Sequence, residues 1–139
     1  MIQRIQTLWL LAATASAALT FKFSFYSGNQ IGKDNLPEFK SLTATSNIFL
    51  ITLTAILVAG SLFAIFLYNK RKKQLRFTII IILISIINLV LYFNELKKFT
   101  SGTISLTSVF AFAIPVLLFF AIRGIWKDEK LVKSLDRLR

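Results

Sequence analysis

The chain has 139 residues, of which 17 are Lys or Arg and 6 are Asp or Glu, and it contains no His and no Cys. This length fits a single domain, and the lack of His and Cys excludes a zinc-type ligand set, a disulfide bond and a Cys or His nucleophile. Hydrophobic residues make up 55% of the chain, which excludes a disordered protein, yet the formal net charge is +11. The positions of the charges therefore decide between a nucleic-acid-binding protein and a membrane protein.

Long stretches of the chain carry no charge. A helix needs about 20 mostly apolar residues to cross a hydrocarbon core, and its backbone groups must be hydrogen-bonded within the segment. A water-soluble bundle would keep a charged outer face on each helix, which residues 5–21, 41–69, 77–94 and 99–122 lack. We therefore predict an all-α integral membrane protein with four transmembrane helices in an up-down bundle, at about residues 5–23, 47–68, 76–95 and 105–126.

The basic residues gather on one side of the predicted spans. Twelve of the 17 lie before the first span, between the second and third, or after the fourth, and the positive-inside rule places this side in the cytoplasm. We expect a multi-pass protein of the bacterial inner (cytoplasmic) membrane with both termini inside, and loops at residues 24–45 and 97–103 outside. The orientation of the spans accounts for the positions of the basic residues. No nucleic-acid partner is therefore expected. Five basic residues lie on the outer side, namely Lys22, Lys33, Lys40, Lys97 and Lys98. An ion pair between Lys22 and Glu95 is one interpretation, and the separate extension of both side chains to water is the other.

The first apolar stretch also fits a signal peptide. Arg4 precedes an apolar centre, and Ala15, Ser16 and Ala17 match a cleavage site. Cleavage after Ala17 would leave three spans with the same cytoplasmic sides, so the charges do not separate the two interpretations. We expect the first helix to be retained.

Polar residues recur every seven positions within the predicted spans. A spacing of seven is two helical turns, so each set falls on one face of its helix. In lipid, such side chains hydrogen-bond between helices, and we expect them to form a mildly polar seam inside a left-handed bundle. The alternative is a polar pathway or small pocket along the seam. The residues assigned to helix packing on this seam are Thr54, Ser61, Ser85, Asn88 and Tyr92.

Two charged segments are candidate contact sites on the cytoplasmic side. The connection at residues 70–76 (KRKKQLR) is expected to bind anionic lipid headgroups, at about 1 kcal/mol per basic residue. The tail at residues 127–139 has mixed charge and leucines at helical spacing, which predicts an amphipathic helix that lies on the membrane, docks a partner or continues the fourth span. The contact residues expected are Arg4, Lys70, Arg71, Lys72, Lys73, Arg76, Asp128, Glu129, Lys130, Leu131, Leu135, Asp136, Arg137, Leu138 and Arg139.

Both ends of the chain carry motifs. The opening MIQRIQTLWLL and the closing KDEKLVKSLDRLR resemble an uncharacterised family of small four-helix inner-membrane proteins of Bacteroidota, known only as a domain of unknown function. The resemblance covers the full length and implies four spans and no known activity. It marks two sets of residues on the cytoplasmic side, and we expect them to touch, Arg4 with an acid such as Asp128 or the amides with the tail backbone. The marked residues are Gln3, Arg4, Gln6, Asp128, Glu129, Lys130, Ser134, Asp136, Arg137 and Arg139.

The predicted spans lack the residues that most catalytic and proton-coupled transport sites need. No span centre holds a carboxylate, His or Lys, the glycines form no phosphate loop, and Ser and Thr have no His partner. We expect no catalytic, cofactor or metal site. The sequence favours a non-enzymatic subunit or scaffold that binds a membrane or cytoplasmic protein through its cytoplasmic face and tail. A small transporter or channel that uses the polar seam is the alternative, and a membrane enzyme acting on lipid is the weakest hypothesis.

Overall fold

The described part of the chain forms four helices and three short strands. The structure is a computed structural model, and it describes residues 3–31 and 36–136, with the side chains of these residues except at positions 3, 4, 133, 135 and 136. The elements are α1 (Gln3–Leu19), β1 (Tyr26–Ile31), β2 (Pro37–Leu42), α2 (Ile48–Phe66), α3 (Arg71–Leu96), β3 (Phe99–Ile104) and α4 (Val109–Asp136), with short 3₁₀ turns at Leu67–Asn69 and Leu106–Ser108.

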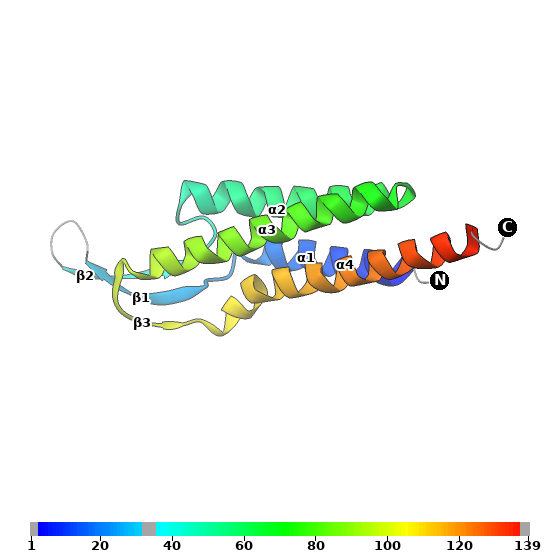
Figure 1. The fold of residues 1–139 in the computed structure, drawn as a ribbon. Coiled ribbons are helices and arrows are strands. Elements are labelled where there is room, and N and C mark those ends of the chain that lie inside the picture. Colours follow the sequence, from blue (N-terminus) through cyan, green and yellow to red (C-terminus); the bar gives the residue numbers. More distant parts are fainter. Residues whose placement is uncertain (1–2, 32–35, 137–139) are drawn as a thin grey trace.

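The helices lie side by side as an elongated bundle, and each runs opposite to the one before it (Figure 1). α1 packs against α2 and α4, and α3 packs against the same two helices, so the four form a ring in chain order. The start of α1 and the end of α4 lie at one end, which we call the terminal end. The strands project from the opposite end, which we call the sheet end.

The buried face of each helix follows a heptad spacing. On α3 the buried residues are Gln74, Thr78, Ile81, Ser85, Asn88 and Tyr92, which are separated by alternating steps of four and three. α2 shows the same steps through Leu50, Thr54, Leu57, Ser61 and Ala64. This spacing keeps one stripe of a helix against its neighbours. Five of the six buried α3 residues are polar, so the stripe that faces the interior is the more polar one.

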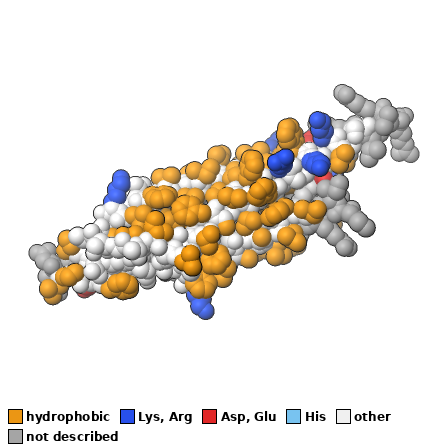
Figure 2. Space-filling view, turned by 90° about the horizontal axis from the view of Figure 1, so that it is seen from below, with side chains coloured by type: hydrophobic (Ala, Val, Ile, Leu, Met, Phe, Trp, Pro, Cys, Tyr) orange, Lys and Arg blue, Asp and Glu red, His pale blue; other side chains and the backbone are white. Residues whose placement is uncertain are grey.

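The outer surface of the bundle is apolar. On α3, Ile80, Ile87 and Val90 are each exposed by more than half, whereas Asn88 between them is 2% exposed. Figure 2 shows hydrophobic side chains over the middle of the bundle, with Lys and Arg toward its ends. A protein in water places its apolar stripe inside and its polar stripe outside, so this distribution is the one expected for a bundle surrounded by lipid.

Three helical segments are long and apolar enough to cross a membrane, namely Ile48–Asn69, Arg71–Leu96 and Leu106–Val132, and the 18-residue windows within them have mean hydropathies of 2.5, 2.4 and 2.2. The fourth apolar helix is shorter, at Ile5–Leu19. Two helices differ in extent from the spans expected within them. The first helix ends at Leu19, four residues before residue 23, and the third begins at Arg71, so most of the basic segment is helix rather than connection.

The outer segments form a sheet that the sequence analysis expected as loops. Residues 26–31 and 37–42 make an antiparallel hairpin, and β3 pairs with the other edge of β1, giving the strand order β2-β1-β3. Phe25 anchors the sheet to the bundle, because its ring stacks on Tyr92 of α3 at a centroid distance of 4.6 Å. Its backbone is hydrogen-bonded to Leu42 on one side and Ser105 on the other.

Two glycines allow β1 and β3 to approach closely. Gly28 faces Gly102 in the register, and a Cβ added to Gly28 would lie 2.7 Å from the Gly102 Cα. The neighbouring atoms belong to the backbone, which cannot rotate away as a side chain can. This pair of glycines therefore fixes how tightly the two strands meet.

We expect Gly28→Ala to lower the free energy of unfolding by about 1–3 kcal/mol, because the new methyl group forces the paired backbones apart. Gly60→Ala in α2 is the matched control, since the neighbours of its added Cβ are side-chain atoms, the nearest belonging to Ile81 at 3.2 Å. Thermal unfolding of the detergent-solubilised protein measures both. Equal losses from the two variants would show that the strand contact is not tight.

Candidate functional site

The five polar residues assigned to the seam all lie inside the bundle. Thr54, Ser61, Ser85, Asn88 and Tyr92 are each 2% exposed or less. Asn88 Nδ2 donates to Thr54 Oγ1 at 3.4 Å, which joins α3 to α2. Ser85 bonds only within its own helix, to the carbonyl of Ile82 at 2.7 Å. In the described part of the chain, Asn88 Oδ1 has no hydrogen-bond partner, and the Tyr92 hydroxyl lies beside the hydroxyls of Thr20 and Thr54 without a well-aligned hydrogen bond.

The seam extends beyond these five residues, to Thr14, which follows Thr7 at the predicted spacing of seven, and to Gln74, which that spacing did not mark. Thr14 Oγ1 lies 2.7 Å from Ser61 Oγ, which joins α1 to α2. Gln74 is 3% exposed and donates through Nε2 to the carbonyl of Ala64 at 2.9 Å, which joins α3 to α2 near the terminal end. Gln74 lies four residues before Thr78, so the heptad steps would have predicted its inward position. The seam is a set of neutral hydroxyl and amide contacts between helices.

A second polar group joins three helices at the terminal end. Gln6 of α1 and Asp128 of α4 are 6% and 4% exposed, and Gln6 Nε2 donates to Asp128 Oδ2. Arg71 Nη1 of α3 donates to the backbone carbonyl of Asp128 at 3.3 Å. Gly124 makes room for Gln6, since a Cβ there would lie 2.9 Å from Gln6 Cγ.

The expected contact between the opening and closing motifs of the chain is present in this group. The amide of Gln6 meets the side chain of Asp128, rather than the tail backbone. The side chain of Arg4 lies outside the described part, so its expected pairing is a prediction that the structure leaves open.

The basic segment forms one wall of a surface pocket at the terminal end. The pocket has a volume of about 520 Å³. We call it the basic pocket, and it is lined by Asn69, Lys70, Arg71, Lys72, Lys73, Glu129 and Val132. The first five come from the corner between α2 and α3, and the last two come from α4. Arg76 is exposed on α3 one turn further along.

The predicted tail is the last part of α4, which runs without a break to Asp136. Trp126, Leu131 and Val132 are exposed there by 66%, 45% and 41%. A smaller pocket of about 210 Å³ on this part of α4 is lined by Arg123, Trp126, Lys127 and Lys130. The side chains of Leu135 and Asp136, and the whole of residues 137–139 with Arg137, Leu138 and Arg139, lie outside the described part.

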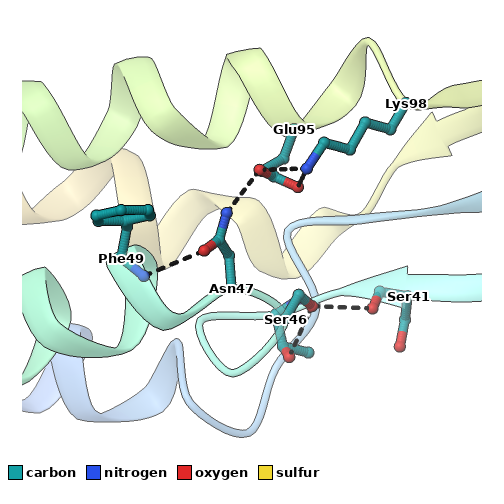
Figure 3. A network of polar contacts seen from close by, with 7 residues as sticks. Ser41, Ser46, Asn47, Phe49, Glu95 and Lys98 are labelled. Atoms are coloured by element: carbon teal, nitrogen blue, oxygen red, sulfur yellow. Dashed lines mark hydrogen bonds and ion pairs between the residues drawn. The ribbon is translucent and has the colours of Figure 1, made fainter.

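At the sheet end, Glu95 pairs with a residue other than Lys22. Glu95 forms an ion pair with Lys98 at 2.8 Å and accepts a hydrogen bond from Asn47 Nδ2 at 2.8 Å (Figure 3). Asn47 also caps α2, because its Oδ1 accepts from the Phe49 amide at 3.1 Å. Lys98 lies one turn after Glu95, so the local pair forms without the ordering of a distant side chain.

The polar interior, the apolar exterior and three membrane-capable helices define a class of protein, the α-helical bundle suited to lipid. Comparison with known families then identifies the chain more closely. The model of the family described as Domain of unknown function (DUF4293) matches residues 2–138, so the chain belongs to that family. The resemblance to an uncharacterised family is thereby confirmed. No curated protein and no solved structure matches this chain.

We expect Ser61→Ala to lower the free energy of unfolding by about 0.6 kcal/mol, because it removes the hydrogen bond between α1 and α2. Ser85→Ala is the matched control, since Ser85 is equally buried but bonds only within its own helix, and it should change the stability less. Equilibrium unfolding in mixed detergent and SDS micelles measures both variants. A loss at Ser85 as large as that at Ser61 would contradict an interhelical role for the seam.

Proposed function

We propose that the protein is a non-enzymatic integral protein of the inner membrane that crosses it four times, with both termini in the cytoplasm. In this proposal it acts as a subunit or scaffold that binds another protein through its cytoplasmic face and the end of α4. The observation that carries it is the separation of side chains, with exposed apolar residues around the bundle and 12 of the 17 basic residues on the termini side of the spans.

The packing of α1 supports a fourth span. α1 has 17 residues and is about 25 Å long at 1.5 Å per residue, which is close to the thickness of a hydrocarbon core. It lies between α2 and α4, both of which include membrane-capable segments. Its outward residues Ile5, Leu8 and Leu11 are exposed by 57%, 62% and 57%, as are apolar residues on its neighbours. A helix in this place shares the surroundings of the helices beside it.

The same contacts argue that the first helix is retained. Cleavage after Ala17 would remove Thr14 from Ser61 and Gln6 from Asp128. Buried polar groups that lose their partners in an apolar surrounding cost about 1–3 kcal/mol each. The bundle therefore depends on the segment that a signal peptidase would remove.

The end of α4 supports a protein contact. It extends beyond the start of α1 at the terminal end (Figure 1) and carries exposed apolar and charged side chains together. A purely lipid-binding helix is rich in basic residues on its polar face, whereas here the half-buried Glu129 stands beside the exposed Lys127 and Lys130. A surface with both signs of charge and exposed leucine suits a protein partner.

A small transporter or channel is the second candidate. The observation that favours it is the burial of Asn88 Oδ1 without a partner in the described part of the chain, because an unpaired polar group inside a bundle can serve a polar solute. The seam holds neutral groups, however, and several of them bond between helices. Those contacts favour helix packing over conduction.

Single cysteines test the topology, since the natural chain has none. We expect a membrane-impermeant maleimide to label Ser101→Cys in intact spheroplasts, and to label Gln3→Cys and Ser134→Cys only after the membrane is permeabilised. Labelling of Gln3→Cys from outside would contradict the fourth span. Ser61→Cys separates the two candidate functions, because it reacts from the aqueous phase only if water enters the seam.

Leu131→Asp tests the partner surface. We expect it to reduce at least tenfold the amount of any partner that co-purifies in gentle detergent, because Leu131 is exposed on α4 and a carboxylate there would have to be desolvated at an interface. Phe39→Asp is the control, since Phe39 is an exposed apolar residue on β2 at the opposite end. Quantitative mass spectrometry compares the proteins recovered. The same recovery from both variants would contradict binding through α4.

A further inference from the structure

The basic pocket has the charge of an anion site. Its lining contributes four cations, Lys70, Arg71, Lys72 and Lys73, and one carboxylate, Glu129. The cations stand on consecutive residues at the corner before and at the start of α3, so they are held near one another by the backbone. The positive end of the α3 dipole lies at the same place and adds to their potential.

The pocket is a partly open recess rather than a closed cavity. Its volume of about 520 Å³ lies between the α2–α3 corner and the last part of α4. A group that enters it meets cations on one side and α4 on the other. A headgroup with its glycerol backbone fits a volume of this size, which is within the range of small-molecule sites.

The position of the pocket along the bundle axis indicates which kind of molecule carries the anion that it binds. Phe66 and Tyr68, just before the lining residue Asn69, are exposed by 75% and 57%. Exposed aromatic residues next to charged ones mark the boundary between hydrocarbon and headgroups. Val132 gives the lining an apolar part as well. A molecule that reaches the pocket from this boundary carries acyl chains below an anionic head.

We infer that the basic pocket binds the phosphate of one anionic phospholipid molecule. Lys and Arg form charge-assisted hydrogen bonds with phosphate oxygens, and these are stronger than bonds between neutral groups. The bound headgroup bridges the start of α3 and the last part of α4. The inference rests on the proposed function in one respect, the position of the bundle in a membrane, and it deepens the expected headgroup contact by assigning it to a defined site.

A lipid in this pocket would act on the proposed partner surface. The lining residues Glu129 and Val132 lie on α4 on either side of Leu131, and Arg71 already holds the carbonyl of Asp128. The headgroup therefore fixes the direction in which the last part of α4 leaves the bundle. Lipid composition becomes a determinant of partner binding.

The test uses the full chain in nonionic detergent, titrated with soluble dioctanoyl phospholipids and followed by native mass spectrometry. We expect phosphatidylglycerol to bind in a one-to-one ratio and phosphatidylcholine to bind at least tenfold more weakly. Replacing two pocket lysines in Lys72→Gln/Lys73→Gln should weaken phosphatidylglycerol binding about 30-fold, from about 1 kcal/mol per basic residue.

The matched control is Lys127→Gln/Lys130→Gln. It removes the same charge from the same end of the bundle, from exposed residues of α4 that line the smaller pocket. We expect it to weaken binding by less than threefold. Helix content and thermal stability, measured for each variant, show that both proteins fold.

Three results would overturn the inference. Equal losses from the two double variants would show diffuse attraction by the whole basic end. Equal binding of phosphatidylcholine would show that the negative charge is not recognised. Competition by inorganic phosphate at the same concentration as the lipid would identify a soluble phosphate site. Because the assay is done in detergent, it depends neither on membrane orientation nor on a partner, so its failure is distinguishable from a failure of the proposed function.

Discussion

The requirement that polar groups be hydrogen-bonded away from lipid governs this protein. Helices satisfy their own backbones, but the hydroxyls and amides of residues such as Ser61, Asn88 and Gln74 need partners on neighbouring helices or on their own turns. Placing these residues at steps of three and four turns them all inward. The isoleucines and phenylalanines between them then face outward, which is where a lipid-embedded bundle can carry them without cost.

The two ends of the bundle are under a different constraint from its middle, because in the proposed membrane position they face water and headgroups. At the sheet end, three strands and the stacked rings of Phe25 and Tyr92 close the interior. At the terminal end, the carboxylate of Asp128 is buried, and a buried acceptor of this kind is stable only with donors. Gln6 supplies one, and Arg71 holds the same residue by its carbonyl, so α1, α3 and α4 are joined where the basic pocket opens. The end that holds most of the charge is thus also the end fixed most firmly by polar contacts between helices.

The helical part could be predicted well because its signals are local. Charge-free stretches of sufficient length predict α2, α3 and α4, and the seven-residue spacing identifies the buried residues, including Thr54, Ser85 and Tyr92. The sheet could not be predicted in this way. Residues 99–104 pair with residues 26–31, some 70 positions away, and short polar strands have no strong signal of their own. Gly28 and Gly102 are the residues that allow the two backbones to approach closely. Their role becomes visible only when the two strands are paired, so it cannot be recognised from the sequence.

The sequence by itself determined the distribution of charge, the long apolar helices and the face that each one buries, since these follow from composition and from the geometry of a single helix. Tertiary structure decided which groups meet across the bundle. It paired Glu95 with Lys98 and Asn47 rather than with Lys22, and Asp128 with Gln6. It also turned the line of basic residues after Asn69 into a wall of a pocket, because α4 lies opposite. Hydrogen bonds and pockets depend on distances of a few ångströms between elements, and those distances are set by helix packing rather than by the spacing of residues along the chain.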